Sequence, residues 1–222
     1  MIFDAGLWET FESALPLMLK GCMVTLWISA IGIAGGFLLG CVFGVLDCNK
    51  LRRPWLSVFL RSYVTIFRGT PLFVQLLIVY FALPDALGLE ISPISAGIIT
   101  LSLNSTAYLA EVIRAGINAI DPGQWEASYI LGYSSYKTFR YIILPQALRN
   151  VMPAITNEFA TLIKESSILM VIGVPELLKM SKDIVAHNLK PMEIYLLAAF
   201  FYLIMTYAVA IGARFFEGRA KV

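Results

Sequence analysis

The amino-acid sequence predicts an all-α, polytopic membrane protein with five spanning helices, and three observations lead to this fold class. Of the 222 residues, 59% are hydrophobic and only 14% are charged, which is too apolar for a soluble domain of this length. The apolar residues form runs long enough to span a bilayer. Most Lys and Arg residues gather in alternate connections between these runs. We therefore expect one domain, residues 1–222, that buries its apolar surface in lipid and in helix–helix contacts.

Cysteine and histidine usage argues against disulfide, metal and hydrolase sites. Cys22, Cys41 and Cys48 are odd in number and lie in or beside an apolar run, which predicts free thiols. His187 is the only histidine and lies in a polar segment, so we expect no metal site and no catalytic residues. No basic residue precedes Lys20, whereas a cleaved signal peptide needs a basic start, so none is expected.

Residues 4–18 predict a helix that lies in the membrane interface. Its apolar side chains share one helical face, and its acidic side chains lie elsewhere. The apolar face comprises Leu7, Trp8, Phe11 and Leu15. A plain continuation of the first span is the alternative.

The first span, residues 21–46, carries no charge and exceeds the ~20 residues that a spanning helix needs. Glycine recurs every four residues along it, at Gly32, Gly36, Gly40 and Gly44. Because these positions have no side chain, another helix can approach closely. We therefore predict a packing face without chemistry of its own.

The second span, residues 62–84, is less regular than the first. Only residues 69–84 are free of charge, a run of about 16 residues that is short for a bilayer. Arg68 is therefore expected at the membrane edge, or inside the membrane with a partner. An interfacial arginine whose side chain snorkels to water is the alternative to a functional one.

The third span, residues 91–113, carries a polar stripe along one face. At 100° per residue, its polar side chains fall within an arc of about 120°. Such a stripe faces protein or water rather than lipid. Glu111 and Arg114 are three residues apart near one membrane edge, and we predict a structural ion pair between them. The stripe comprises Thr100, Asn104, Tyr108, Glu111 and Arg114.

The connection over residues 121–145 is neither membrane-apolar nor disordered. Asp121 can cap a helix, Pro122 suits its first position, and Gln124 stands where a capping box needs it. Gly132 supplies a left-handed stop, so we predict a helix over residues 123–131. A second short helix is expected from Ser134 or the next residue to just before Pro145. Two short capped helices between spans are typical of a docking surface.

Residues 151–173 form the fourth predicted span, although five polar residues interrupt it. At ~1.5 Å per residue, Glu158 would lie about 6 Å from the middle of the span. A carboxylate there costs roughly 2.5–3.5 kcal/mol, so it needs a partner or a wet cavity. We predict that Glu158 contacts a polar solute, with a structural partner such as Lys164 as the alternative. The five residues share an arc of about 120° and are Asn157, Glu158, Thr161, Lys164 and Glu165.

The fifth span, residues 193–213, is free of charge from Ile194 onward, and the charges in the connections then predict the orientation. Eleven Lys and Arg residues lie on one side and four on the other, with Arg68 and Lys164 unassigned. The positive-inside rule puts the eleven in the cytoplasm, so residues 121–145 are cytoplasmic, the N-terminus is outside and the C-terminus is inside. The eleven are Lys50, Arg52, Arg53, Arg61, Arg114, Lys137, Arg140, Arg149, Arg214, Arg219 and Lys221, and the four are Lys20, Lys179, Lys182 and Lys190.

Three short motifs, in order along the chain, resemble the signatures of one family. Residues 126–128, Gly132, Ile142 and residues 144–145 resemble the EAA---G---------I-LP motif of the membrane-spanning subunits of bacterial ABC importers, with Ser128 in place of the second alanine. The runs RGTPLFVQ from Arg68 and AYLAEVIR from Ala107 resemble signatures of the polar amino acid subgroup, the histidine, glutamine and arginine type. The resemblance covers roughly residues 15–221.

This resemblance implies the type I ABC importer permease fold and a permease subunit that moves a polar or basic L-amino acid into the cytoplasm by alternating access. Coupling to a separate ATPase would use the cytoplasmic segment, through Glu126, Ala127, Ser128, Gly132, Leu144 and Pro145. Substrate contacts would fall to Asn104, Ser105, Asn157, Glu158 and Thr161. Arg68, Glu111, Arg114 and Lys164 would be structural or line the pathway.

The resemblance also implies partners in the bacterial inner membrane. These are a cytoplasmic ABC ATPase dimer that binds ATP and Mg, a second permease subunit, identical or related, and an extracytoplasmic amino acid-binding protein. The chain has no G-x-x-x-x-G-K-[ST] phosphate loop, so we expect it to bind no cofactor itself, and we expect no nucleic acid partner. A passive channel or carrier for a small polar solute is the alternative function; it would leave the capped cytoplasmic segment unexplained.

Overall fold

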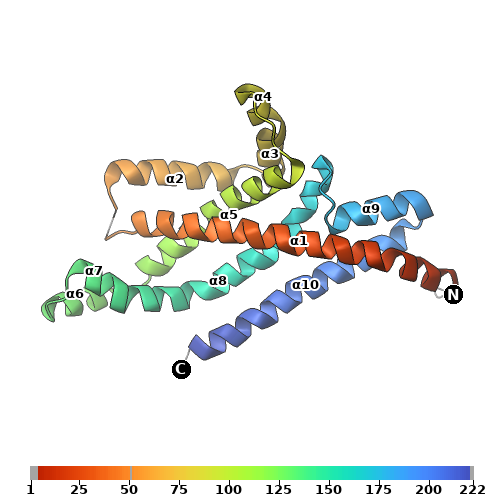
Figure 1. Ribbon diagram of the computed structural model, residues 1–222. Coiled ribbons are helices and arrows are strands. Elements are labelled where there is room, and N and C mark those ends of the chain that lie inside the picture. Colours follow the sequence, from red (N-terminus) through yellow and green to blue (C-terminus); the bar gives the residue numbers. More distant parts are fainter. Residues whose placement is uncertain (1–4, 51, 221–222) are drawn as a thin grey trace. The chain divides into compact units, whose positions relative to one another are not determined.

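Every element of the described chain is helical (Figure 1). The computed structural model describes residues 5–50 and 52–220, and side chains over residues 10–50 and 52–213. Turns connect the helices, and no strand occurs in these ranges. The predicted all-α class is therefore confirmed.

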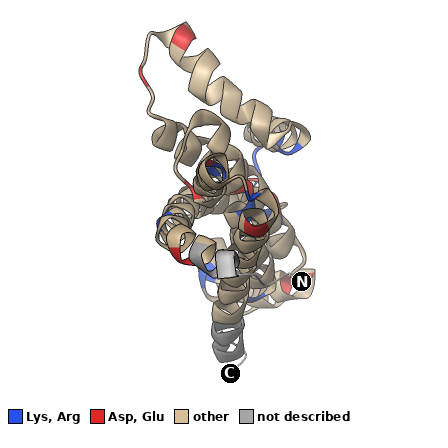
Figure 2. Cartoon of the chain, turned by 90° about the vertical axis from the view of Figure 1, so that its right-hand side faces the viewer, with Lys and Arg blue, Asp and Glu red and all other residues tan. Residues whose placement is uncertain are grey.

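The long helices carry most of the described residues. They are α1 (Ala5–Leu46), α2 (Pro54–Gly69), α5 (Pro93–Asn118), α8 (Leu144–Glu165) and α10 (Pro191–Ala220). The shorter helices are α3 (Leu72–Leu77), α4 (Leu83–Leu87), α6 (Pro122–Ile130), α7 (Ser135–Thr138) and α9 (Leu177–Asn188). Two π-helical turns, η1 (Ile78–Ala82) and η2 (Phe139–Ile143), and one 3-10 segment, η3 (Ser166–Ile172), continue these helices. Figure 2 shows how few of the residues are charged, since most of the ribbon is tan.

The chain folds into two compact units whose segments alternate along the sequence. The first unit takes the described parts of Met1–Gly32, Leu72–Leu101 and Phe159–Val209. The second takes Ile33–Pro71, Ser102–Glu158 and the described part of Ala210–Val222. Because α1, α5, α8 and α10 each pass from one unit to the other, neither unit is a continuous stretch of sequence.

In the first unit, the beginning of α1 packs against α9. A Cβ atom added at Gly21 would lie only 2.8 Å from the Leu177 Cα, so the two backbones approach closely here. The buried core of this unit also includes side chains from α8 and α10. Its members are Ala14, Met18, Cys22, Ile163, Leu177, Ile184, Ile194, Ala198 and Met205.

The glycine stripe of α1 is a packing face, as predicted, and the helix that packs against it is α5. In the second unit, a Cβ atom added at Gly36 would lie 2.5 Å from the Ser105 Cβ, and one at Gly40 would lie 2.8 Å from the Leu109 Cβ. In the first unit, Gly32 faces Leu101 in the same way at 3.0 Å. Any larger residue would push the two helices apart, so the glycines set this close packing.

The predicted interfacial helix is not a separate element. The described part of α1 runs without a break from Ala5 to Leu46, which agrees with the alternative of a continued first span. At ~1.5 Å per residue α1 is about 63 Å long, so it tilts or extends beyond a hydrocarbon core of ~30 Å. Asp4 and the side chains of Leu7 and Trp8 lie outside the described residues.

The second predicted span is interrupted in its middle. α2 ends at Gly69, Thr70 is extended with φ −116° and ψ 145°, and Pro71 precedes α3. A residue before proline is pushed out of the α-helical region, because the proline ring clashes with its backbone. The span over residues 62–84 stays a prediction, and the proline signal for the break in its helix was present in the sequence.

Three described helices are long and apolar enough to cross a membrane: Thr10–Leu46, Pro93–Asn118 and Pro191–Ala213. The bent pair Pro54–Gly69 and Leu72–Leu87 makes a fourth if it forms one span. The predicted span over residues 151–173 is helical through Ile172, but its polar residues keep it out of this set. The count of five spans stays a prediction.

Candidate functional site

The capped segment over residues 121–145 begins with α6, and its predicted start and stop are confirmed. The Asp121 Oδ1 accepts a hydrogen bond from the Gly123 N–H at 2.6 Å, and Pro122 occupies the first turn. α6 ends at Ile130, and Gly132 follows with φ +79°, a left-handed conformation that favours glycine. The Gln124 side chain reaches across to Gln146 at 3.5 Å rather than closing a capping box.

Trp125 anchors α6 to the rest of the second unit. Its side chain is only 3% exposed and lies in a cluster drawn from α1, α5, α6, η2 and α8. A large aromatic side chain buried among aliphatic ones holds a short helix that could not persist alone. The buried members of the cluster are Cys48, Ile113, Ile117, Ile120, Trp125, Ile143 and Ala147.

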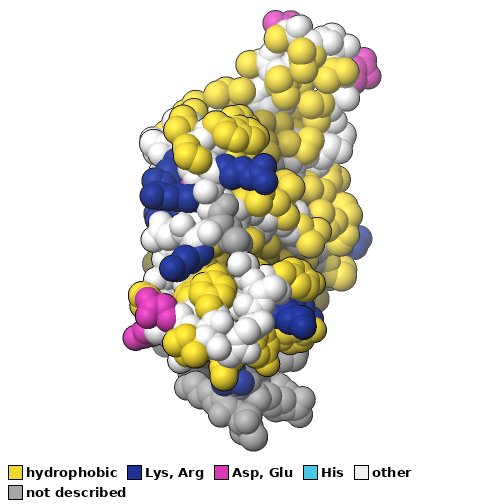
Figure 3. All heavy atoms as spheres, turned by 90° about the vertical axis from the view of Figure 1, so that its left-hand side faces the viewer, with side chains coloured by type: hydrophobic (Ala, Val, Ile, Leu, Met, Phe, Trp, Pro, Cys, Tyr) yellow, Lys and Arg dark blue, Asp and Glu magenta, His cyan; other side chains and the backbone are white. Residues whose placement is uncertain are grey.

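The other side of α6 is exposed. Glu126 and Ala127 face outward, and the two residues after them on this surface, Ile130 and Leu131, are 86% and 73% exposed. Figure 3 faces the end of the molecule where α6 and α7 lie, and it shows hydrophobic side chains between Lys and Arg side chains. An exposed apolar patch rimmed by polar groups is typical of a protein–protein contact.

Ser128, the departure from the family motif, is buried rather than exposed. The Ser128 Oγ donates to the Trp125 carbonyl oxygen at 2.7 Å, and it lies 2.9 Å from the Thr138 Oγ1. Both hydroxyl groups are buried, and each is a hydrogen-bond partner of the other across the turn at Gly132. The two hydroxyls therefore join α6 to α7.

The second short helix, α7, ends at Thr138 and therefore before Pro145, as predicted, but the helical path does not stop there. α7 starts after Ser134, whose Oγ accepts from the Lys137 N–H at 3.4 Å, and it passes through η2 directly into α8. In η2 the Leu144 N–H donates to the Phe139 carbonyl oxygen, five residues back. The wider π-helical turn carries the chain past Pro145, which would clash in a regular α-helix. Leu144 is half-buried and Pro145 is exposed.

The polar residues of α8 and α5 differ in exposure. Asn157 and Lys164 are exposed, Glu158 and Thr161 are half-buried, and Asn104 of α5 is buried. Asn104 and Glu158 both lie in the second unit, whereas Thr161 lies in the first. Each unit therefore brings some of the predicted substrate residues into a partly enclosed setting.

Ser105 does not belong with these residues. Its side chain is 0% exposed, and its Cβ lies where α5 meets Gly36 of α1. Among the residues that the structure describes, its buried Oγ has no hydrogen-bond partner. The adjacent helix covers this hydroxyl, so we assign Ser105 to packing and no longer to substrate contact.

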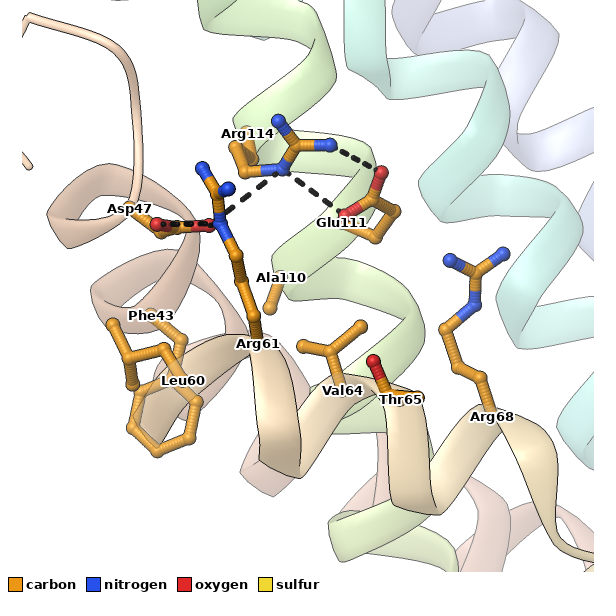
Figure 4. Close-up of a pocket in the computed structure, with 10 residues that line it drawn as sticks. All are labelled: Phe43, Asp47, Leu60, Arg61, Val64, Thr65, Arg68, Ala110, Glu111 and Arg114. Atoms are coloured by element: carbon orange, nitrogen blue, oxygen red, sulfur yellow. Dashed lines mark hydrogen bonds and ion pairs between the residues drawn. The ribbon is translucent and has the colours of Figure 1, made fainter. Parts of the chain in front are cut away.

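The predicted ion pair of α5 is part of a larger cluster (Figure 4). The Arg114 Nη2 lies 2.6 Å from the Glu111 Oε1, which confirms that pair. Asp47, just after α1, is buried and lies 2.9 Å from the Arg61 Nε and 3.8 Å from the Arg114 Nε. Sequence reasoning missed Asp47 and Arg61, although both stand at the end of an apolar run. Arg68 lies over the Tyr108 ring at 5.2 Å.

A second buried carboxylate, Glu176 in the first unit, was also missed. It caps α9 by accepting from the Leu178 N–H at 2.8 Å and the Lys179 N–H at 2.7 Å. The Tyr202 hydroxyl of α10 donates to the same carboxylate at 2.8 Å. Burial raises the pKa of Glu176, and these three donors oppose that shift. The sequence signal for this capping role was Pro175, because α9 starts two residues after it.

Comparison with known proteins identifies the family that this sequence matches. A protein-family model described as "Binding-protein-dependent transport system inner membrane component" matches residues 36–222. The chain is 38% identical over 224 residues to the glutamine transport system permease protein GlnP of Escherichia coli K12, covering 100% of both chains. It is 39% identical to the arginine transport system permease protein ArtQ of Bacillus subtilis, covering 93% of this chain and 94% of that one.

Two solved structures support the fold. A crystal structure of an amino acid ABC transporter with histidines has a TM-score of 0.89 and 35% identity, covering 99% of this chain and 100% of that one. An inward-facing structure of the MetNI methionine ABC transporter has a TM-score of 0.82 at 20% identity, covering 94% and 98%. The second likeness concerns the fold alone.

Proposed function

Because this chain belongs to the family of inner membrane components of binding-protein-dependent transport systems, we propose that it is the permease subunit of an ABC importer for a polar or basic L-amino acid. The observation that carries the proposal is the similarity over the whole length to a glutamine permease. The family is one of transport proteins rather than enzymes. ATP hydrolysis would therefore belong to a separate subunit, which would bind ATP and Mg.

The capped segment is the proposed contact with that ATPase. Trp125 holds α6 from behind, and the Ser128–Thr138 hydrogen bond fixes its turn. Glu126 and Ala127 remain exposed for a partner. η2 joins α7 to α8 without a loop, so force applied to the capped segment would pass into α8.

The solute would contact the polar residues of α5 and α8. Glu158 suits an ammonium or guanidinium group, and Asn104, Asn157 and Thr161 can hydrogen-bond a carboxylate or amide. Every amino acid carries an α-ammonium, so this set favours a polar amino acid without selecting one. The printed names of the relatives, glutamine and arginine permeases, agree with that class.

The proposed assembly follows the charge distribution. Under the positive-inside rule, the side of α6, which carries eleven Lys and Arg residues, would face the cytoplasm, with the C-terminus inside and the N-terminus outside. A binding protein would deliver the amino acid from outside, and a second permease subunit would complete the pathway. Alternating access would expose a central cavity to each side in turn.

Uptake in proteoliposomes tests the proposal. The chain and its co-purified ATPase are reconstituted, and a panel of labelled amino acids is offered with the binding protein, with and without internal ATP. We expect ATP-dependent accumulation of one polar amino acid. Uptake that ignores ATP would favour a passive channel or carrier and contradict the importer.

The variant Glu158→Gln tests whether Glu158 contacts the solute, independently of whether the permease assembles with the ATPase. We expect the KM for uptake to rise about tenfold, since a charged hydrogen bond is lost, while the ATPase still co-purifies. Arg149→Gln, which changes an exposed residue on the same helix, is the matched control. Unchanged uptake kinetics for Glu158→Gln would assign that carboxylate a structural role.

A further inference from the structure

Five charged side chains lie together in the second unit, near the C-terminal ends of α1 and α5. We call these five side chains the arginine cluster. They are Asp47, Arg61, Arg68, Glu111 and Arg114. Two carboxylates face three guanidinium groups. Asp47 pairs with Arg61 and Arg114, and Glu111 pairs with Arg114. The ion pairs therefore leave one positive charge in excess, and it belongs to Arg68.

Arg68 keeps guanidinium N–H groups that can donate to a ligand. In the described part of the chain, no carboxylate lies within 4.0 Å of its guanidinium group, which instead stacks on Tyr108. Stacking uses the face of the guanidinium plane, so the N–H groups at its edge stay available. Figure 4 shows the side chain rising from α2 beside Glu111, apart from the paired arginines.

A cavity of about 280 Å³ lies among these residues. Arg61, Thr65 and Arg68 line it from successive turns of α2, and Figure 4 shows all three on the side of α2 that faces α5. Its remaining wall is apolar and includes Val64 and Ala110. At ~30 Å³ for each water molecule, the cavity holds about nine, which leaves room for a phosphoryl group with part of its hydration.

The outer face of α2 is apolar and exposed. Trp55, Val58, Phe59 and Ile66 recur at helical spacing, and each is between 59% and 70% exposed. In a membrane protein such a face contacts lipid chains, and tryptophan is favoured at the headgroup level. The same helix, α2, therefore has an apolar face suited to lipid and an arginine-lined cavity beside it.

We propose that the arginine cluster binds a phosphoryl monoanion, supplied by the headgroup of an anionic phospholipid. Arg68 is its charged ligand and Thr65 its hydroxyl donor. One phosphodiester charge neutralises the one excess guanidinium, and guanidinium groups pair with phosphate oxygens through two parallel hydrogen bonds. Anionic lipids gather at arginine clusters of this kind beside membrane helices. None of the proposed solute contacts is among the residues that line this cavity.

Native mass spectrometry of the complex in mild detergent tests the lipid site. The chain and its co-purified ATPase are incubated with equal amounts of phosphatidylglycerol and phosphatidylcholine, and retained lipids are counted. We expect wild type to prefer phosphatidylglycerol, and Arg68→Gln to lose about five- to tenfold of that preference. Arg68→Lys should restore part of it. Arg149→Gln, which removes an exposed arginine of α8 outside the cavity, should leave the preference unchanged.

Inorganic phosphate distinguishes the source of the anion. If the headgroup is the ligand, millimolar phosphate should displace phosphatidylglycerol from wild type. Thermal stabilisation by phosphate that needs Arg68, without lipid preference, would keep the anion site and overturn the lipid source. If neither response depends on Arg68, the proposal fails. Should Arg68→Gln not assemble with the ATPase, Thr65→Val serves instead, with an expected two- to threefold loss of preference.

Discussion

Buried polar side chains act at the residue scale by joining elements that hydrophobic contact alone would leave free to slide. Ser128 and Thr138 join α6 to α7, and Glu176 joins α9 to α10 through Tyr202. A buried polar group without a partner is costly, so each bond fixes one relative position of the two helices.

Ser128→Ala, which restores the alanine of the family motif, should destabilise the protein. It leaves the buried Thr138 hydroxyl without its partner, at a cost of about 1–3 kcal/mol. Thr138→Val should cost less, because the Ser128 hydroxyl still donates to the Trp125 carbonyl oxygen. The double variant should be more stable than the sum of the single effects, since no unpaired hydroxyl remains. Thermal unfolding midpoints in detergent measure all three, and strictly additive losses would contradict the coupling.

Glu176 should make stability depend on pH. Burial raises its folded-state pKa above the unfolded value of ~4.3, so the folded state binds its proton more tightly. This contribution is complete below the unfolded pKa and is lost as pH rises through the folded pKa. Wild type should therefore lose thermal stability relative to Glu176→Gln as pH rises from about 4 through that range. Tyr202→Phe removes a hydrogen bond that lowers the pKa, and it should move the loss to higher pH. Parallel pH curves for wild type and Glu176→Gln would contradict this prediction.

At the scale of elements, two features shape this chain: the close approach of two helix backbones and a local change of helical pitch. The glycine stripe lets α1 lie directly on α5, and the π-helical turn η2 lets one helical path run from α7 into α8. Both features depend on what a single residue lacks: a side chain at glycine, and an N–H group at Pro145.

Gly36→Ala should weaken the α1–α5 contact. Its new methyl group would lie 2.5 Å from the Ser105 Cβ, so overpacking of about 1–3 kcal/mol outweighs the helical preference of alanine. Gly212→Ala is the matched control, because nothing lies within 4 Å of a Cβ atom there. It should be neutral or gain up to about 1 kcal/mol. Purified yield and thermal unfolding in detergent compare the two, and equal effects would show that the contact is loose.

At the scale of the whole molecule, the proposed coupling would require that motion at the capped segment reaches the spanning helices. Gly132 lies at the turn of that segment, with a positive φ and open space around it. A side chain there changes the backbone and the charge of the docking surface without disturbing the core.

Gly132→Asp should leave the protein in the membrane but uncouple it from ATP hydrolysis. Aspartate tolerates the left-handed conformation better than most residues, so the main effect is the new carboxylate, which adds a negative charge to a segment that already carries Glu126. Gly132→Asn keeps the residue neutral and tolerates the same backbone, so it should retain more transport. ATP-dependent uptake by proteoliposomes measures the coupling. Full transport by Gly132→Asp would refute a docking role for this turn.

The sequence by itself determined the helical class, the glycine face and the ends of α6. These features follow from local chemistry: apolar runs, a four-residue glycine repeat, and Asp121 and Gly132 at positions with strict backbone requirements. The Glu111–Arg114 pair was also predictable, because its two members lie one turn apart on a single helix.

Only the tertiary structure decided which distant residues meet. Nothing local connects Asp47 with Arg61 and Arg114, or Glu176 with Tyr202. The burial of Ser105 behind Gly36 likewise depends on a second helix that its own neighbours in sequence do not reveal. Contacts between segments far apart in sequence depend on how whole helices pack, and helical periodicity gives the face of each helix but not the partner that covers it.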